Sequence, residues 1–544
     1  MRTFNLKKKT VVLLLTGIVF LTYSFKSKFF EVAKQIEIYN SLFKELNMYY
    51  VDEINPAEFT NKAIKNTLKD LDPYTSFYTE QDVETARIRR AGEYGGIGVA
   101  VNYIKQGIQI SEIYKDFSAD KAGLKVGDII ISVDNQSIKN REIEALSMLL
   151  KGTPNSKLSI EVNRQGNIFR KDMFRDKVVI NAVPFAEMIG ENTGYIALTR
   201  FNEKASSEVK KAYRKLKKQG MTKLVFDLRY NPGGSLLESI RISNFFLPKG
   251  RKIVSTKAKI KKWSTTYRTK NDPLDLEIPM VVLINERSAS ASEIVSGSLQ
   301  DYDRAVIMGK RSFGKGLVQR QKELTYGTQL KLTISKYYTP SGRCIQELDY
   351  KNRDLKTGKV PKFSDTGIHE FKTANGRTVY DGGGVMPDVE MNTSNRNKTT
   401  EELLKSKAIF DFVTLYFYEN KTLENLSDFK FKNSSFNKFV DYLKIDTTFV
   451  IPQESLFKKA FLSAKENNIL KAYNEITEKL AAYKVKEISK NKDIILEIIK
   501  SEIIERYFYK EGVYQYNLKN DKTISEALSL LKNEDKYSDI LSGK

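Results

Sequence analysis

The feature that most constrains the fold is an alternation of apolar, strand-like runs with helical segments across residues 181–395. One helix is expected over Ser206–Lys218, where apolar residues recur at helical spacing. The expected strands are short and almost uninterrupted in their hydrophobicity, as strands buried on both faces are: Gly194–Leu198, Leu224–Leu228 and Pro279–Asn285. Strands separated by helices predict an α/β layered architecture for this region.

Two of these strands end in residues that suit catalysis. The first leads into Asn231-Pro232-Gly233-Gly234, where adjacent glycines leave backbone N–H groups open to an oxyanion. The second leads through Ser288-Ala289-Ser290-Ala291-Ser292 into an expected helix, whose N-terminus stabilises developing negative charge. Each pattern has a plainer interpretation, because paired glycines also make simple turns and serine is a favoured helix N-cap.

A nucleophilic serine needs a base, and the chain has one histidine, His369, in a polar stretch typical of a surface position. The better candidate is Lys315, which lies between two glycines and close to Phe313 and Leu317. A lysine held among apolar groups loses its preference for the charged form and can act as a base near neutrality. Gln319 could hold its amine by a hydrogen bond. Taken alone, this segment would be better explained as a solvated lysine in a glycine turn.

Residues 91–180 have a different character. Gly92–Val101 is predicted to be a glycine-rich loop running into a short strand, and Ser118–Asp134 a short helix, a turn and a strand. Together these segments resemble a PDZ domain. In that interpretation the loop residues Gly95, Gly96, Ile97 and Gly98 bind a peptide's terminal carboxylate beside an open strand edge. A glycine-rich loop by itself is more often a tight turn.

The order of these motifs is similar to that of the carboxyl-terminal processing (tail-specific) serine protease family. Two later segments, Tyr337–Arg343 and Gly384–Val389, add to the resemblance, which covers about residues 30–395. It implies that Ser290 is the nucleophile, Lys315 the general base and Gln319 its supporting amide. The oxyanion amides would come from Gly233 or Gly234 and from Ala291.

The same resemblance implies an α/β crotonase-like (ClpP/crotonase-type) protease core with an inserted PDZ domain and helical N- and C-terminal regions. The expected division is a signal segment at 1–28, an N-terminal helical region at 29–90, the PDZ domain at 91–180, the serine protease core at 181–395 and a helical extension at 396–544. The reaction requires neither a cofactor nor a metal. The substrates would be proteins with free C-termini, and whether the PDZ domain gates the site is an open hypothesis.

The N-terminus predicts export. Basic residues precede Val11–Phe25, a run without charge that is short for a membrane-spanning helix, and no small-residue cleavage site follows it. An uncleaved signal anchor is favoured over a cleaved signal peptide. The protein is therefore expected to be exported, in the periplasm or facing outward, and attached to a membrane by this segment.

The composition excludes several other classes. One cysteine leaves no intramolecular disulfide and no cysteine-rich zinc site, and one histidine leaves no multi-histidine metal site. The net charge of +23 comes from basic residues interspersed with acidic ones, which is typical of solvated helix faces and does not indicate a nucleic-acid partner. An inactive PDZ scaffold would predict loss of Ser290 or Lys315, and both are present.

The last region carries no motif that we assign. Ser406–Glu419 and Ile494–Tyr509 have the pattern of amphipathic helices. A helical extension packed on the core is the simpler interpretation; the alternatives are docking onto an adaptor, self-association with a second protomer, and a membrane contact.

Overall fold

The computed structural model describes residues 29–139, 146, 149–354, 356–391, 396–420, 423–432, 434–464 and 470–544. These form two compact units, divided between Phe77 and Tyr78. The predicted signal segment, 1–28, lies outside the described residues. None of the helices within the described ranges is both long and apolar enough to cross a membrane.

The first unit is helical. Residues 29–49 form one helix and α2 (Pro56–Lys69) the next. Helix α2 begins where it does because Pro56 occupies its first position and the Asn55 side chain accepts hydrogen bonds from the amides of Ala57 and Glu58. The turn that follows is held by Asp72, whose Oδ1 accepts from the Tyr74 and Thr75 amides at 2.8 Å each.

The second unit begins with α3 (Glu80–Ala91) and a PDZ-like sheet. The strand order in this sheet is β3-β4-β5-β7-β8, with β6 paired to β5. The strands are β3 (Val99–Ile104), β4 (Gly107–Ile113), β5 (Ile129–Val133), β6 (Gln136–Ser137), β7 (Lys157–Arg164) and β8 (Asn167–Phe174), with α4 (Ser118–Lys121) between β4 and β5. Because β3 has a partner on one side, it is an edge strand of this sheet.

One expectation for this domain was wrong. The segment predicted as a loop contains a strand, β2 (Glu93–Gly96), which pairs antiparallel with β9 (Asp176–Val179). Glycine-rich sequences have little strand propensity of their own. Here the strand forms because it pairs with a distant segment, and no pattern within the segment itself predicts that pairing.

The α/β prediction for 181–395 is confirmed. A six-stranded sheet runs β10-β11-β12-β15-β16-β21, parallel from β11 onward with β10 antiparallel at the edge. Its strands are β10 (Phe185–Ile189), β11 (Thr193–Ala197), β12 (Lys223–Asp227), β15 (Met280–Ile284), β16 (Val306–Gly309) and β21 (Val389–Glu390). The three strands expected from the sequence in this region are β11, β12 and β15.

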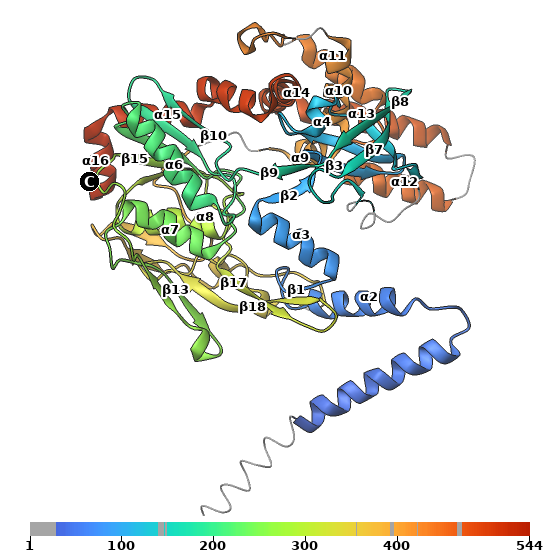
Figure 1. Cartoon of the computed structure of the whole chain (residues 1–544), viewed down its shortest axis with the longest axis horizontal. Coiled ribbons are helices and arrows are strands. Elements are labelled where there is room, and N and C mark those ends of the chain that lie inside the picture. The colour runs from blue at the N-terminus through green and yellow to red at the C-terminus, as the bar shows by residue number, and fades with distance from the viewer. Residues whose placement is uncertain are drawn as a thin grey trace, which may run out of the picture. The chain divides into compact units, whose positions relative to one another are not determined.

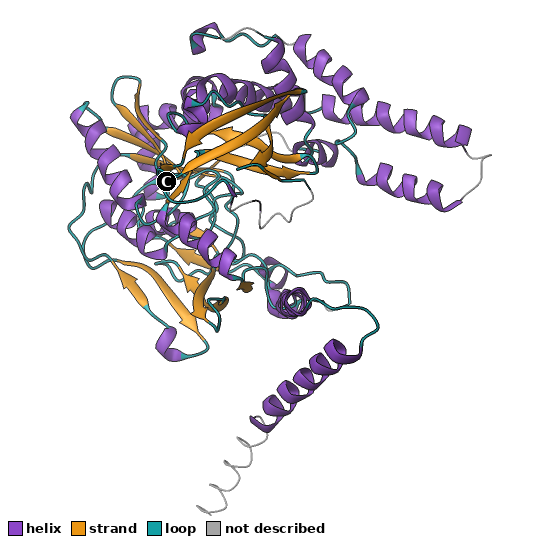
Figure 2. Cartoon of the chain, turned by 45° about the vertical axis from the view of Figure 1, so that its right-hand side comes forward, coloured by secondary structure: helices purple, strands orange, loops and turns teal. Residues whose placement is uncertain are grey.

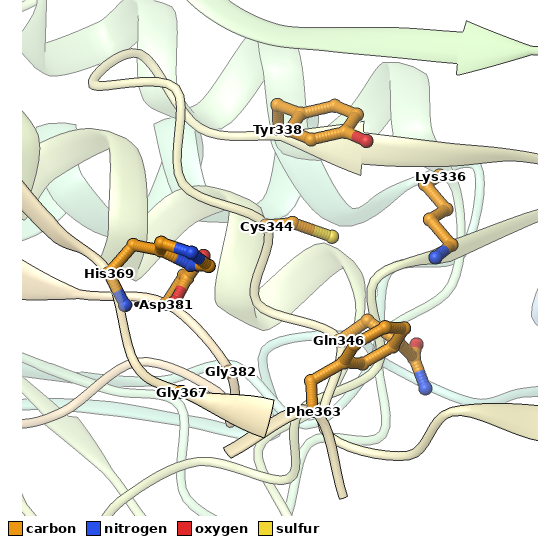
Figure 3. A pocket seen from close by; sticks show the side chains of 9 residues that line it. All are labelled: Lys336, Tyr338, Cys344, Gln346, Phe363, Gly367, His369, Asp381 and Gly382. Carbon is orange, nitrogen blue, oxygen red and sulfur yellow. Dashed lines mark hydrogen bonds and ion pairs between the residues drawn. The ribbon is translucent and has the colours of Figure 1, made fainter. Parts of the chain in front are cut away.

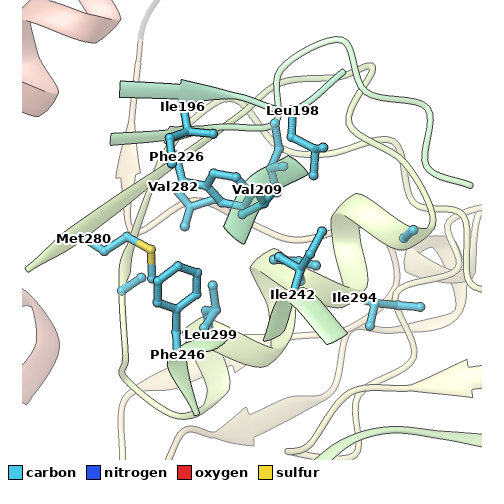
Figure 4. Close-up of a cluster of buried hydrophobic side chains, with 14 of the residues drawn as sticks. Ile196, Leu198, Val209, Phe226, Ile242, Phe246, Met280, Val282, Ile294 and Leu299 are labelled. Atoms are coloured by element: carbon cyan, nitrogen blue, oxygen red, sulfur yellow. The ribbon is translucent and has the colours of Figure 1, made fainter. Parts of the chain in front are cut away.

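Alternate residues of this sheet face two different layers. Helices α6 (Ala205–Lys218), α7 (Leu236–Phe246) and α8 (Ala291–Asp301) cover one face, where Phe226 and Val282 lie in a continuous apolar core (Figures 1 and 4). The other face carries Val225 and Leu283, which pack against α15 (Lys522–Lys532) from the far end of the chain. The sheet is therefore buried on both sides, as its nearly continuous hydrophobic strands require.

A second sheet lies in the same region. It contains β13 (Lys252–Ala258), β14 (Thr266–Arg268), β17 (Leu317–Glu323) and β18 (Gln329–Tyr338), with β18 between β13 and β17. The polar insert that follows forms short turns, Tyr350–Asn352 and Phe363–Thr366, and a hairpin of β19 (Glu370–Lys372) and β20 (Thr378–Tyr380).

The C-terminal region is helical, as expected. Its helices are α9 (Lys398–Lys405), α10 (Ala408–Glu419), α11 (Ser434–Ile445), α12 (Pro452–Ala464), α13 (Leu470–Ser489), α14 (Lys492–Asn520), α15, and α16 (Glu534–Ser542). Helices α12 and α13 form a projecting pair (Figures 1 and 2). The rings of Phe461 and Tyr473, one on each helix, stack with their centroids 4.0 Å apart. Helix α14 is kinked at Tyr509, whose φ is 57°. Phe410 of α10 and Tyr509 of α14 pack against the PDZ core.

Candidate active site

The two strand ends singled out in the sequence lie side by side. Strands β12 and β15 are parallel neighbours, with Asp227 opposite Leu283, so the loops that follow them leave the same edge of the sheet. The carbonyl oxygen of Asn231 ties the loops together, because it accepts hydrogen bonds from the Ala289 amide at 3.0 Å and from Ser292 Oγ at 2.9 Å. The Asn231–Gly234 loop is thereby fixed against the serine-bearing corner.

Ser290 occupies the N-cap position of α8 with φ 56° and ψ −109°. A positive φ is uncommon for a residue with a side chain and persists only where the surroundings impose it. The backbone is held from both sides: the Ser290 amide donates to Glu293 Oε2 at 2.7 Å, and the Tyr337 hydroxyl donates to the Ser290 carbonyl oxygen at 3.2 Å. The serine side chain is half-buried at the N-terminus of the helix.

The buried Glu293 carboxylate joins the serine to the lysine segment. Oε2 accepts from the backbone amides of Ser290, at 2.7 Å, and Lys315, at 3.0 Å. Oε1 accepts from Ser312 Oγ at 2.6 Å and from the Gly314 amide at 2.7 Å. Both candidate catalytic residues are therefore anchored to one oxygen atom of a fully buried side chain.

Burial raises the pKa of Glu293, and the hydrogen bonds from Ser312, Gly314, Lys315 and Ser290 oppose that rise. Sequence reasoning assigned no role to this residue. Its signal was present, since a serine followed three positions later by glutamate is the capping-box pattern at a helix start.

The Lys315 segment is fixed on several sides. The Phe313 amide donates to the Ser288 carbonyl oxygen at 3.0 Å, and the Gly316 amide donates to Gln346 Oε1 at 2.8 Å. The Lys315 side chain is half-buried. Gln319 lies in β17 and donates from Nε2 to Thr333 Oγ1 at 3.2 Å. The hydrogen bond expected between Gln319 and the lysine amine stays a prediction.

The two glycines differ in the hydrogen bonds of their amides. The Gly233 amide donates to Asn231 Oδ1 at 2.9 Å. Within the described ranges, no hydrogen bond is found from the amides of Gly234 and Ala291. A Cβ placed on Gly233 would lie 2.9 Å from both the Ala291 nitrogen and the Ser290 Cβ, so this loop is in direct contact with the serine corner. Of the glycine pair, Gly234 is thus the better candidate for an oxyanion donor.

The predicted peptide-binding residues divide into two groups. Gly95 and Gly96 belong to strand β2, and the Gly95 carbonyl accepts from the Gly152 amide at 3.1 Å. Ile97 and Gly98 form the turn before β3; their carbonyl oxygens accept from the amides of Ala119 and Tyr114. Gly98 has φ +79°, and a Cβ there would meet Phe117 at 2.4 Å, so this turn requires glycine.

His369 is a surface residue, as the sequence indicated: its side chain is 76% exposed and pairs with Asp381 at 3.1 Å. It lines a cavity of about 210 Å³ together with Lys336, Tyr338, Cys344 and Gln346 (Figure 3). Neither Ser290 nor Lys315 lines this cavity. Neighbouring residues of a strand point to opposite faces, and Tyr337, between Lys336 and Tyr338, is the residue that contacts Ser290.

Comparison with known proteins agrees with this arrangement. The model of peptidase family S41 matches residues 192–352, a PDZ-domain model matches 109–164, and a model described as the probable PDZ-protease C-terminal helical domain matches 399–531. The carboxy-terminal-processing protease of Bartonella bacilliformis is 34% identical over 319 residues, which cover 58% of this chain and 73% of that protein. The chain belongs to the carboxy-terminal-processing proteases of peptidase family S41. The resemblance of its sequence motifs to this family is confirmed.

Other relatives match over a smaller share of their length. A probable CtpA-like serine protease of Staphylococcus aureus is 32% identical over 312 residues, 56% of this chain and 61% of the relative. Among solved structures, the photosystem II D1 C-terminal processing protease is 24% identical with a TM-score of 0.36, covering 64% of this chain and 91% of its own.

Proposed function

We propose that this protein is an exported serine endopeptidase that recognises the C-terminal tails of protein substrates through its PDZ domain and cuts them with a Ser290–Lys315 dyad. The observation that carries the proposal is the shared anchor at Glu293, which binds the backbone amides of both residues. Membership of a serine protease family supports the same reaction class. We also propose that the core has the crotonase-type arrangement.

In the proposed reaction, neutral Lys315 takes the Ser290 hydroxyl proton as the serine oxygen attacks the peptide carbonyl carbon. The carbonyl π electrons move to its oxygen, and the amides of Gly234 and Ala291 donate to that oxyanion. Lys315 then gives its proton to the leaving amine as the C–N bond breaks. Water, deprotonated by the same lysine, hydrolyses the acyl-enzyme and restores the serine.

The PDZ domain would hold the substrate's free carboxylate at Ile97 and Gly98, with the tail added as a strand along the β3 edge. The edge position of β3 and the glycine-dependent turn support this role. The proposal includes export and attachment to a membrane through residues 1–28. For the C-terminal helices it names two alternative partners, an adaptor and a second copy of the chain.

The dyad is tested with Ser290→Ala and Lys315→Ala in an assay of peptide-bond cleavage on an unfolded protein with an apolar C-terminus. Each variant should lose cleavage by at least about 10³-fold and keep the wild-type circular dichroism spectrum. Lys322→Ala, a change of a lysine in β17 that is half-buried like Lys315, is the matched control and should cut normally. Full activity of Lys315→Ala would end the dyad proposal.

Tail recognition is tested separately with two peptides that differ only in a free or an amidated C-terminus. The free peptide should be cut with the lower KM, because the amide removes the charge that the loop amides would bind. Equal kinetic constants for both peptides would refute the role of the PDZ domain and leave the dyad intact.

A further inference from the structure

Asp521 connects the C-terminal helical region to the catalytic edge of the sheet. It ends α14 and begins α15, and its Oδ1 accepts from the amides of Thr523 and Ile524 at 2.8 and 3.3 Å. Its other oxygen, Oδ2, accepts from Arg229 Nη1 at 2.7 Å. One oxygen therefore caps a helix and the other holds an arginine that lies almost 300 residues earlier in the chain.

Arg229 is clamped between two carboxylates. Asp227, the last residue of β12, accepts from Arg229 Nη2 at 2.6 Å and from Nε at 3.0 Å, and also receives the Tyr195 hydroxyl at 2.7 Å. The arginine side chain is 15% exposed and the two carboxylates 7% and 21%. Burial alone would lower the pKa of Arg229, but the two carboxylates outweigh it and raise that pKa.

The clamp is placed where the oxyanion loop begins. Directly after Arg229, Tyr230 takes a positive φ of 60°, and its amide donates to Asn285 Oδ1 at 2.9 Å. The chain then enters the segment in which Asn231 bonds the Gly233 amide. Only three residues separate Arg229 from Gly233, and one of them, Pro232, has a fixed φ.

The helix that Asp521 caps, α15, is packed on the sheet. The apolar residues of α15, among them Ile524 and Leu531, are buried against Val225 and Leu283 of the strands that carry the two catalytic loops. Helix α15 thus cannot slide without uncovering the sheet, and its capping carboxylate has a fixed position relative to β12.

We propose that Asp521 is a positioning residue of the catalytic site: its carboxylate holds Arg229 and thereby sets the oxyanion loop, Arg229–Gly234, for the reaction. The inference rests on the proposed function and extends it to the C-terminal helical region, for which sequence reasoning had no assignment. Charge, rather than helix capping, is the property of Asp521 that matters for catalysis.

The test is a crossed pair of substitutions. Asp521→Asn keeps a good N-cap and removes the charge, whereas Asp521→Glu keeps the charge and replaces Asp with a residue outside the favoured N-cap set. Asp535→Asn, at an exposed acidic position in the first turn of α16, is the control for loss of one negative charge. For each protein, kcat and KM for a free-tailed peptide and the hydrogen–deuterium exchange of residues 228–236 are measured.

We expect Asp521→Asn to lower kcat by about tenfold and to leave KM within about twofold of wild type. This is a smaller effect than the removal of an entire oxyanion donor, which lowers kcat by about 10²–10³-fold. Exchange in residues 228–236 should become faster. Asp521→Glu should recover most of kcat, and Asp535→Asn should match wild type in both measurements. Any of three results would overturn the proposal. These are a loss of kcat in Asp521→Glu as large as that in Asp521→Asn, unchanged hydrogen–deuterium exchange in Asp521→Asn, and failure of Asp521→Asn to fold. If the wild type itself cuts no peptide, the proposed function fails, while the exchange data still decide whether Asp521 positions the loop.

Discussion

Replacing Glu293 with glutamine changes one atom of the side chain and tests the shared anchor of Ser290 and Lys315. The carboxylate accepts four hydrogen bonds, from the amides of Ser290, Gly314 and Lys315 and from the Ser312 hydroxyl. Glutamine can turn its oxygen toward the Ser290 and Lys315 amides and offer its NH2 to the Ser312 oxygen. The Gly314 amide then has no acceptor.

The cost follows from these contacts. A buried donor left unsatisfied costs about 1–3 kcal/mol, and three charge-assisted bonds become neutral ones, a loss of about 1 kcal/mol each. Removing the buried charge recovers part of this lost free energy, because burial disfavours the ionised form of Glu293 and raises its pKa. We expect a net loss of about 2–4 kcal/mol, which would lower the unfolding temperature of the protease region by roughly 5–10 °C.

Catalysis should suffer more than stability. The Ser290 and Lys315 backbones would both lose a charged anchor, and a displacement near 1 Å lowers a rate by about 10²-fold. Steady-state kinetics on a free-tailed peptide should therefore show kcat reduced by about that factor with KM nearly unchanged. Below 30 °C the variant should remain folded, which circular dichroism checks.

The matched control is Asp388→Asn. Asp388 is likewise a buried carboxyl group with a pKa raised by burial, and it accepts the Ile307 amide at 2.7 Å and Gln300 Nε2 at 2.8 Å. It lies by the amino-terminal half of β16, at the edge of the sheet opposite the catalytic loops. This variant should lose stability and keep kcat. Equal kcat losses in both variants, or a normal kcat in Glu293→Gln, would refute the reasoning.

Two further predictions concern the oxyanion loop and pH. Gly233→Ala should lower kcat by at least about 10²-fold, because its Cβ would press on Ser290 and Ala291. The control is Gly220→Ala: Gly220 has a φ of +94°, close to the +95° of Gly233, but there is open space around its Cβ. This control should show only the backbone cost, about 1–2 kcal/mol in urea unfolding. Similar kinetics in both variants would contradict this. Burial raises the pKa of Glu505 from 4.5 to about 7. The neighbouring carboxylates of Glu112 and Glu502 also raise this pKa, and the positive charges of Lys510 and Arg506 lower it. Its neutral form favours the folded state, so this contribution is complete below pH 4.5 and lost as the pH rises through 7. Between pH 5 and 8 the free energy of unfolding of wild type should fall, relative to Glu505→Gln, by at most about 3 kcal/mol; parallel pH curves in urea denaturation would show that Glu505 titrates normally.

Much of the site could be predicted because its signals are local. Adjacent glycines, alternating serines before a helix and a lysine between glycines each need only a few consecutive residues to be recognised. The buried strands β12 and β15 were equally predictable, since a hydrophobic run bounded by turn residues reflects burial on both faces. That these two strands are parallel neighbours, so that the glycine and serine loops meet at one end of the sheet, came from the structure.

Other features could not be predicted from local patterns. Strand β2 exists because Gly95 and Gly96 pair with Lys177 and Asp176, and the choice of Gly234 over Gly233 depends on the Asn231 side chain taking the Gly233 amide. The first outcome depends on a distant segment, and the second on which of two adjacent amides the nearby Asn231 side chain accepts from. Neither is fixed by residue type alone.

The sequence alone determined which chemical groups are available for catalysis: a serine at a helix start, one candidate lysine and unshielded glycine amides. It also has no second imidazole or cysteine for another mechanism. Tertiary structure decided how these groups are held, through one carboxylate between Ser290 and Lys315 and through Asp521 on Arg229. The reason is physical: side-chain identity and local periodicity are written in consecutive residues, whereas a buried charge can select its partners only after packing has excluded water and brought distant segments within hydrogen-bond reach.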